Sequence, residues 1–423
     1  MTGTAGPSPR GKSRGLDIRP LPIRYSGNGF RYVPLEKTLL DIERFFLETG
    51  LEVQFQILRR ASDESIRAVL EYLSPAGSTK DERYFGKGAS EGQALASACL
   101  EFVERQCSKM SEDDVLTEAS FSEIESEARD PRTFGLDPAK GFHPVMKIDW
   151  VWGQSLTRSE PVLVPANLVF FPYEADRSEK FIAWTDSNGL GSGNTFEEAV
   201  LHAILEVVER DAVVICEYNE SPLSGLSLDG GPLEILKMVE QLAANGYRCT
   251  FKASMTDIEI PVFAAFLRHT KEPDNCSVAV GCHLDPAIAL SRALTEAVQL
   301  LPPAFNHGEW VRSGSPRRYE KRTGIPISFH DFMNPVPSDF RMAIETCVEA
   351  LSRVGSEVIV VDLILPDIPF PTVRVLATGL QPLLHEGDMR FSRRFFEVPV
   401  ILGHHCRSAD PGRVRIWPIV GYR

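Results

Sequence analysis

A glycine is followed fifteen residues later by a glutamate, and three residues after that by a second Glu or Gln, at three places in this 423-residue chain. An alanine also precedes each leading glutamate by seven residues, and an arginine follows the first two copies directly. The copies are Gly86–Ala94–Glu101–Glu104–Arg105, Gly191–Ala199–Glu206–Glu209–Arg210 and Gly281–Ala289–Glu296–Gln299.

Acidic residues spaced i, i+3 lie one above the other on the same face of a helix. The residues around them are largely apolar, and a carboxylate in apolar surroundings is costly unless a cation meets it. A single copy is better explained by a structural Glu–Arg network, but the recurrence of the pattern favours a functional site. Mg2+ prefers oxygen ligands, and arginine binds phosphate in a bidentate manner. The pattern therefore predicts a magnesium–phosphate site with four metal-ligating residues: Glu101, Glu104, Glu206 and Glu209.

Glycine-rich stretches precede the first two acidic helices, at residues 86–88 and 189–194. We expect them to form turns whose backbone N–H groups point toward helix N-termini, which are natural anion sites. Neither is a Walker A loop, and the chain has no G-x-S-x-G or H-E-x-x-H motif. His202 is interpreted as a packed histidine. The adjacent His404, His405 and Cys406 are unsuited to closing one metal coordination sphere, and a surface or core role is expected for them.

Composition narrows the function classes. The formal charge of −13 argues against general nucleic-acid binding, which requires Lys and Arg to neutralise phosphates. The eight cysteines include no C-x-x-C pair, which is typical of reduced cytosolic thiols. Residues 1–16 read as a solvated tail without the apolar segment of a signal peptide, and no apolar run is long enough to span a membrane. We expect a soluble cytoplasmic protein.

Hydrophobic periodicity and capping residues predict an α/β (α+β) fold. Three related strand–turn–helix modules would surround the site, within one domain at residues 17–423. The region 303–337 reads as a long loop that could order over a ligand. Helices are expected near 34–49, 91–109, 196–218, 232–245, 287–301 and 338–354. Strands are expected near 52–58, 146–155, 161–165, 248–254, 260–267, 278–282 and 357–364.

Three segments, at residues 86–105, 187–212 and 289–299, resemble the signature blocks of the YcaO superfamily. The similarity extends from about residue 28 almost to the C-terminus. It implies the YcaO-type fold, with ATP and Mg2+ as cofactors, an ATP-binding core at about 28–301 and a C-terminal αβ portion at about 338–423. It also implies a reaction in which a nucleophile adds to a peptide-backbone carbonyl and the amide oxygen takes the γ-phosphoryl group of ATP.

Carried over by position, the resemblance assigns the four glutamates named above to magnesium and phosphate. It assigns further residues to the nucleotide and its metal shell, and the expected ATP-binding set is Arg31, Thr38, Lys87, Arg105, Ser192, Asn194, Glu198, Arg210 and Arg292.

The resemblance leaves several reactions open. A side-chain nucleophile gives an azoline, sulfide gives a thioamide, and an amine gives an amidine. Many azoline-forming members end in a proline-rich tail, whereas the last ten residues here contain one proline. That difference, and the lack of a fused peptide-recognition domain, favours thioamide formation on a peptide substrate with a TfuA-type or peptide-recognition partner. Azoline and amidine formation stay open, and a non-catalytic ATP-binding scaffold is the candidate from a different class of protein. A homodimer is expected from the resemblance alone.

Overall fold

The computed structural model describes residues 16–26, 29–59, 66–72, 82–88, 90–111, 114, 116–136, 140–173, 180–219, 223–253, 256–301, 324–332, 335–383 and 390–403. The expected tail before residue 16, most of the expected loop at 303–337, and the histidines and cysteine at 404–406 lie outside these residues, as does the rest of the C-terminal segment. No helix among the described residues is long and apolar enough to cross a membrane.

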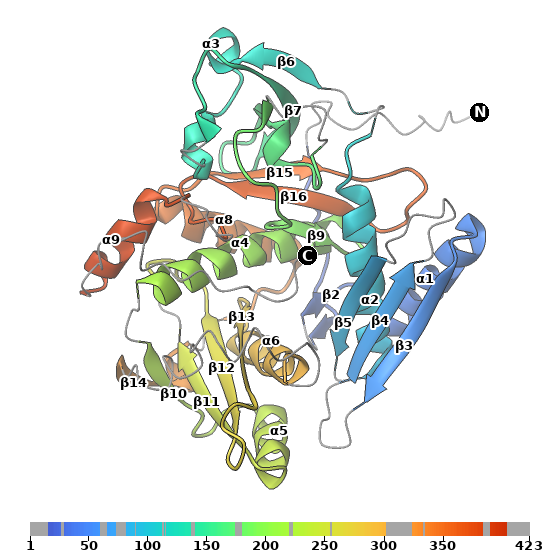
Figure 1. The fold of residues 1–423 in the computed structure, drawn as a ribbon, viewed down its shortest axis with the longest axis vertical. Helices are drawn as coiled ribbons and strands as arrows, with labels where there is room; N and C mark the ends of the chain where they lie inside the picture. Colours follow the sequence, from blue (N-terminus) through green and yellow to red (C-terminus); the bar gives the residue numbers. More distant parts are fainter. Residues whose placement is uncertain are drawn as a thin grey trace.

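The strands form three sheets and a short ribbon (Figure 1). The ribbon joins β1 (Tyr25–Ser26) to β2 (Phe30–Arg31). The three-stranded sheet has the order β3 (Val53–Arg59), β4 (Ile66–Tyr72), β5 (Glu82–Gly88). The six-stranded sheet has the order β6 (Thr117–Ser120), β7 (Lys147–Ser155), β15 (Val358–Asp362), β16 (Thr372–Ala377), β9 (Leu190–Ser192), with β8 (Glu160–Pro165) paired to β7. The five-stranded sheet has the order β13 (Cys276–Cys282), β12 (Val262–His269), β11 (Tyr247–Ala253), β10 (Ser224–Ser227), β14 (Gly324–Ser328).

The helices begin where the sequence supplies caps. Ser90 accepts a hydrogen bond from the Gln93 N–H, the Thr195 hydroxyl accepts one from Glu198 N–H at 3.2 Å, and Asp285 accepts one from Ala287 N–H at 2.8 Å. The main helices are α1 (Leu35–Thr49), α2 (Glu91–Cys107), α4 (Phe196–Tyr218), α5 (Leu233–Ala244), α6 (Pro286–Gln299), α8 (Phe340–Arg353) and α9 (Arg393–Ile401). The single-turn helix α3 spans Phe121–Ile124.

The three copies of the sequence repeat are the pairs β5–α2, β9–α4 and β13–α6. In each pair the repeat glycine lies directly on the helix backbone at the repeat alanine. A Cβ atom at Gly86, Gly191 or Gly281 would stand 1.9, 2.6 or 2.3 Å from the carbonyl oxygen of the corresponding alanine. Those three alanines are fully buried. The repeated glycine therefore allows each strand to approach its own helix closely, which a residue with a Cβ atom would prevent.

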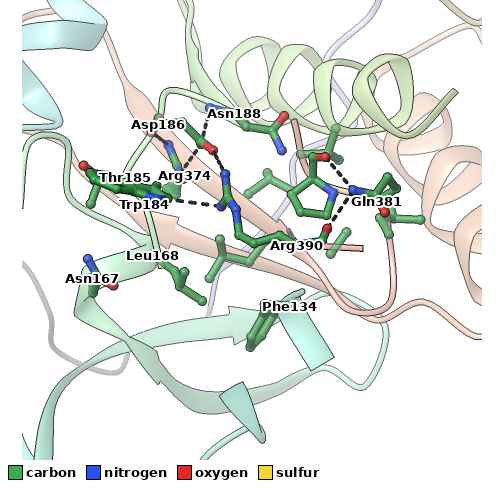
Figure 2. Close-up of a pocket in the computed structure, with 16 residues that line it drawn as sticks. Phe134, Asn167, Leu168, Trp184, Thr185, Asp186, Asn188, Arg374, Gln381 and Arg390 are labelled. Atoms are coloured by element: carbon green, nitrogen blue, oxygen red, sulfur yellow. Dashed lines mark hydrogen bonds and ion pairs between the residues drawn. The ribbon is translucent and has the colours of Figure 1, made fainter. Parts of the chain in front are cut away.

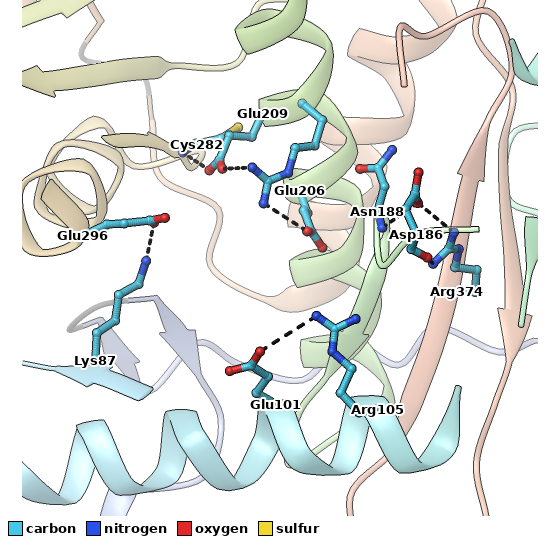
Figure 3. A network of polar contacts seen from close by, with 11 residues as sticks. Lys87, Glu101, Arg105, Asp186, Asn188, Glu206, Glu209, Cys282, Glu296 and Arg374 are labelled. Atoms are coloured by element: carbon cyan, nitrogen blue, oxygen red, sulfur yellow. Dashed lines mark hydrogen bonds and ion pairs between the residues drawn. The ribbon is translucent and has the colours of Figure 1, made fainter. Parts of the chain in front are cut away.

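The three strands of the repeat stand at the edges of three different sheets. The helix of each module contacts the edge strand of the next one: α2 contacts β9, α4 contacts β13, and α6 contacts β5. The modules therefore close into a ring, and the acidic faces of their helices meet around its centre (Figures 1 and 3).

Each repeat helix also has its own apolar core. Helix α2 packs with α1 and residues of the six-stranded sheet, α4 packs with α8 and β16, and α6 packs with α5 and β11–β13. Fully burying one large aliphatic or aromatic side chain contributes about 1.5–3 kcal/mol. Phe102, Ile204 and Leu294, each almost fully buried on its own repeat helix, therefore anchor the three helices independently of the site.

Three expectations about local structure were wrong. Residues 86–88 belong to strand β5 rather than a turn, because β5 pairs with β4 along its whole length. The expected loop at 303–337 contains β14, where Pro326 is tolerated because β14 is an edge strand. No helix or strand was expected after residue 364, but β16 and α9 lie there, and the buried Val373 and Val375 hold β16 inside the six-stranded sheet.

Candidate functional site

The predicted glutamates of α2 and α4 come together at the centre of the ring. Figure 3 shows Glu101 on α2 facing Glu206 and Glu209 on α4, and Glu104 lies close enough to Glu206 for the charge of Glu206 to raise its pKa. On α2, Glu101 accepts a hydrogen bond from Phe85 N–H at 2.9 Å and lies 3.8 Å from the Arg105 guanidinium. On α4, the Arg210 guanidinium lies 3.4 Å from Glu206 and 3.8 Å from Glu209.

Two of these glutamates also join neighbouring modules. Glu104 Oε1 accepts hydrogen bonds from both the backbone N–H and the hydroxyl of Ser192 on β9, each at 3.0 Å. Glu209 Oε2 accepts one from Cys282 N–H on β13 at 3.1 Å. Each second acid of a pair is therefore held by the next edge strand of the ring. Ser192, expected to bind ATP, directs its polar groups to α2.

Burial raises the pKa of all four carboxyl groups. Glu101, Glu104 and Glu206 keep some contact with solvent although protein surrounds them, whereas Glu209 is buried. The pKa of Glu104 rises to about 8, first through burial and then through the charge of nearby Glu206. Carboxylates forced together in this way are stabilised by a divalent cation, and the residues present fit Mg2+.

The described residues contain no preformed group of three His, Cys, Asp or Glu side chains around one metal position. Instead, the two carboxylates on α2 form one pair and the two carboxylates on α4 form another. Mg2+ is usually bound through one or two carboxylates, with phosphate oxygens and waters completing its octahedron. Paired acids suit that mode of binding.

A fifth acid belongs to the site, and the sequence analysis did not include it among the site residues. Glu296 on α6 forms an ion pair with Lys87 on β5, which closes the ring between the third and first modules (Figure 3). Burial acts to raise the pKa of Glu296, but the charges of Lys87 and Arg210 hold it below the usual value. The repeat itself signalled this residue, since Glu296 occupies the position of Glu101 and Glu206.

Positive charge gathers beside the acids. Burial, followed by the charges of Arg292, Arg31 and Lys87, lowers the pKa of His202 to about 3. The pKa of His283 also falls to about 3, through burial and then through Arg292 and Arg31. Arg31 and Arg292 therefore lie near both imidazoles, and Lys87 lies near that of His202. Three residues expected to contact ATP are thus brought together from β2, β5 and α6.

A hydrogen-bonded chain connects the N-terminal segment to the start of α4. The Thr38 hydroxyl donates to Asn194 Oδ1 at 2.9 Å, and Asn194 Nδ2 donates to Glu198 Oε2 at 3.0 Å. The other oxygen of Glu198 accepts from Tyr32 N–H at 2.8 Å. Residues that are distant in sequence are therefore joined by hydrogen bonds next to Arg31, and Thr38, Asn194 and Glu198 of the expected ATP-binding set lie together.

Arg374 on β16 is a further charged neighbour that sequence reasoning missed. Its Nη1 donates to the Asp186 carbonyl at 2.8 Å, and its Nη2 lies 3.3 Å from the Asp186 carboxylate. Its charge acts to lower the pKa of Glu206, although burial dominates and raises it. A single arginine within a strand carried no signal in the sequence.

Comparison with known proteins identifies the family. The model of the family described as YcaO cyclodehydratase, ATP- and Mg2+-binding, matches residues 85–381. A protein of Methanothermobacter thermautotrophicus is 32% identical over 322 residues, which cover 70% of this chain and 81% of that protein. A protein of Rhizobium leguminosarum bv. trifolii, described as lying in the tfuA 3′ region, is 29% identical over 335 residues, or 70% of this chain and 76% of the relative.

Solved structures share the fold. YcaO from Methanopyrus kandleri, bound with AMPPCP and Mg2+, superposes with a TM-score of 0.69 and 26% identity over 85% of this chain and 95% of that one. A heterocyclase in complex with substrate and cofactor gives a TM-score of 0.80 at 22% identity, and the match covers 92% of this chain but 57% of the heterocyclase. With a family model that spans more than half of its length, the chain belongs to the YcaO family of ATP- and Mg2+-binding proteins.

Proposed function

We propose that the protein is an ATP-dependent enzyme that activates a backbone amide of a peptide. The observation that supports this proposal is the group of acids that includes Glu104. The pKa of Glu104 is raised to about 8, and cationic side chains from other modules lie beside the acids. Such a site pairs carboxylates for metal ions with arginines for phosphates, as phosphoryl transfer requires.

The residue roles in this proposal follow from position. Glu101, Glu104, Glu206 and Glu209 would hold Mg2+, which offsets the charge of the triphosphate. The cationic residues contact phosphates. Arg31, Lys87 and Arg292 bind the triphosphate, and Arg105 and Arg210 contact the phosphoryl group that is transferred. The third group, Thr38, Ser192, Asn194 and Glu198, positions the others through the hydrogen bonds described above.

The chemistry needs little from the protein besides positioning and charge. A nucleophile adds to the amide carbon, the amide oxygen takes the γ-phosphoryl group, and that oxygen then leaves as phosphate. The nucleophile comes from the peptide or from solution, so a protein nucleophile is unnecessary. This agrees with a site composed of acids and cations.

For the specific reaction we propose thioamide formation with a TfuA-type partner. The support is the description of the Rhizobium relative, which lies in a tfuA 3′ region. Azoline formation is the second candidate, since the family description is cyclodehydratase and the heterocyclase shares the fold. Amidine formation is a third candidate reaction, and a non-catalytic ATP-binding scaffold is the candidate that involves no reaction.

The test is a Glu206→Gln variant assayed for ATP turnover with Mg2+ and candidate peptides. We expect a loss of about 100-fold or more, comparable to removing one preorganised charge at a transition state. The control is Glu240→Gln, an exposed position on α5 that should retain activity. Undiminished turnover in the Glu206 variant would contradict a catalytic role for the acid ring.

Mass spectrometry of the treated peptide then separates the reactions. A mass gain equal to the exchange of oxygen for sulfur identifies a thioamide. A loss of one water identifies an azoline or an amidine, which fragmentation distinguishes. Binding of ATP with no turnover and no mass change across peptides and partners would favour the scaffold.

A further inference from the structure

The aromatic ring of Phe171 lies against a cation of the proposed ATP site. The central carbon of the Arg105 guanidinium stands over the face of this ring, 5.2 Å from the ring centre. A guanidinium within about 6 Å of an aromatic ring centre is attracted by the negative charge of the ring face. Arg105 therefore has a neighbour in the site that is neither an acid nor a phosphate.

The backbone of Phe171 is fixed to the end of the helix that carries Arg105. Phe171 N–H donates to the Ser108 carbonyl oxygen at 2.8 Å, and the Ser108 hydroxyl donates to the Phe171 carbonyl oxygen, also at 2.8 Å. The same hydroxyl lies 3.1 Å from the Arg105 carbonyl oxygen. Ser108 is fully buried and stands about one helical turn after Arg105. These contacts hold the Phe171 main chain beside the turn of α2 that begins at Arg105.

The segment that leads to Phe171 is anchored on its other side as well. The preceding Phe170 is almost fully buried in the apolar core that surrounds α2. Asn167 Oδ1 accepts hydrogen bonds from the backbone N–H groups of residues 182–183, at 3.0 Å each. Asn167 also lines a small cavity together with Trp184 (Figure 2). The ring of Phe171 therefore projects from a backbone that several contacts hold in place.

Arg105 lies among the acids of the site, so its orientation matters there. Its guanidinium is 3.8 Å from Glu101, and Figure 3 shows it rising from α2 toward the side of the ring that carries Glu206. Its charge acts to lower the pKa of Glu101, Glu104 and Glu206, in each case against the larger effect of burial. A rotation of the Arg105 side chain would change its distance from any phosphoryl group bound beside these acids.

The two printed contacts of the Arg105 guanidinium differ in how they respond to a metal ion. Glu101 is assigned to Mg2+ above, and a carboxylate that ligates Mg2+ has less negative charge to offer a guanidinium. The ring of Phe171 has no oxygen ligand for Mg2+, so its contact with Arg105 does not compete with the metal. An aromatic face suits this place, because it holds a cation without taking up a carboxylate or a phosphate.

We infer that Phe171 is a positioning residue for Arg105, and that its ring supports the guanidinium in the orientation that meets the γ-phosphoryl group of ATP. The inference rests on the role proposed above for Arg105 at the transferred phosphoryl group. It adds an aromatic side chain to a site that otherwise consists of acids, cations and their hydrogen-bond partners.

The test measures nucleotide binding by calorimetry and needs no peptide. It compares Mg2+–AMPPCP, which has a γ-phosphoryl group, with Mg2+–ADP, which lacks one. Phe171→Leu keeps an apolar side chain but removes the aromatic face, and Phe171→Tyr restores that face. Phe142→Leu is the matched control, because Phe142 is also a partly buried ring but packs in the separate cluster around Trp150.

We expect Phe171→Leu to bind Mg2+–AMPPCP about three- to thirtyfold more weakly than the wild type, which is the range for losing a partly desolvated cation–π contact. Its affinity for Mg2+–ADP should stay the same, and Phe171→Tyr and Phe142→Leu should bind both nucleotides as the wild type does. In an Arg105→Gln background, Phe171→Leu should have no further effect, because the ring acts through Arg105.

Three results would overturn the inference: no loss of Mg2+–AMPPCP affinity in Phe171→Leu, an equal loss for Mg2+–ADP, or the same loss in the Arg105→Gln background. If Phe171→Leu does not fold, fluorinated phenylalanines at position 171 take its place. Fluorine withdraws electrons from the ring face and nearly keeps the shape of the side chain, so the Mg2+–AMPPCP affinity must fall as fluorines are added. An affinity independent of the number of fluorines contradicts the role of the ring.

The two proposals fail separately. If ATP and Mg2+ support peptide modification but Phe171→Leu binds Mg2+–AMPPCP as the wild type does, the role of Phe171 is wrong and the proposed function stands. If Phe171→Leu loses Mg2+–AMPPCP affinity selectively and the protein turns over no ATP with any peptide, Phe171 positions Arg105 in a binding site and the catalytic proposal is wrong.

Discussion

Glu104 and Glu296 belong to equivalent helices of the repeat, yet their charges are balanced differently. Burial and the nearby Glu206 raise the pKa of Glu104 to about 8. Burial also acts to raise the pKa of Glu296, but the charge and hydrogen bond of Lys87, together with the charges of Arg210 and Arg292, outweigh burial and hold it below its usual value. The acid of the third module is therefore neutralised by a lysine of the first module, while the first two modules carry acids that a metal ion would stabilise.

At the residue scale, this difference predicts a dependence on pH. Glu104 has a pKa of about 8 in the folded protein and an ordinary value of 4.5, so between these values the folded state holds a proton that the unfolded chain releases. The stability of the ligand-free protein should therefore fall as pH rises from about 4.5 to about 8. Mg2+ with ATP should restore it, and increasingly so toward the upper limit, because metal binding requires the carboxylate. Thermal unfolding with and without Mg2+–ATP across this range measures both effects.

The control for this prediction is Glu104→Gln, which removes the titrating group. The variant should show a flatter pH dependence and release fewer protons when Mg2+–ATP binds, as measured by calorimetry in buffers of different ionisation enthalpy. Identical proton release in wild type and variant would show that Glu104 is already ionised without ligand.

At the element scale, the contact between each repeat glycine and its helix is open to a direct test. In Gly281→Ala the new Cβ would stand 2.3 Å from the Ala289 carbonyl oxygen and 2.7 Å from Ala293 N. Neither backbone group can move without displacing α6 from β13. We expect the free energy of unfolding to fall by about 3 kcal/mol, at the upper end of the cost of overpacking. Denaturant unfolding measures the change.

The matched control is Gly225→Ala on β10, where an added Cβ meets no atom within 4 Å and the glycine does not adopt positive φ. That variant should remain within about 0.5 kcal/mol of the wild type, as is usual for substitutions away from special contacts. A similar loss in both variants would mean that β-strand glycines, rather than the strand–helix contact, determine the effect.

The helices of the three modules were predictable because cap and apolar periodicity agree at each one, whereas the strands β5 and β9 were expected to be glycine-rich turns. Helix α4 was predicted at its observed bounds, and the acids on α2 and α4 were correctly placed together. Strand β14 and helix α9 were missed because Pro326 and Pro399 interrupt their patterns, although tertiary pairing or packing holds both. Arg374 was not predictable, since its partners come from residues that only the sheet order brings near.

At the scale of the whole molecule, a buried ion network ties the C-terminal helix to the helix that carries Arg210. Arg394 on α9 donates to both carboxylate oxygens of Asp211, at 3.0 and 2.9 Å, and to Asp257 at 2.6 Å. Asp211 is fully buried and follows Arg210 directly. The residue after Arg210 is therefore held by a segment 183 residues further along the chain.

Arg394→Ala should lower the free energy of unfolding by about 3–5 kcal/mol, because it leaves Asp211 charged and buried without its main cation. The adjacent Arg393→Ala is the control, since the Arg393 side chain is 85% exposed and pairs only with the partly exposed Glu397 among the described residues. Equilibrium unfolding of both variants tests the difference. Equal stabilities would show that α9 is held by its apolar contacts instead.

The ring of modules has a consequence for the order in which the protein becomes active during synthesis. The contact that closes the ring joins Lys87 to Glu296, which are 209 positions apart. The acids on α2 and α4 are held by the edge strands β9 and β13, which leave the ribosome one after the other. Domains fold as their residues emerge, and contacts of long sequence separation form late. A nascent chain that has exposed only the first two modules lacks Glu296, which pairs with Lys87. We therefore expect the ring, and with it the proposed ATP site, to be completed only after α6 has been translated.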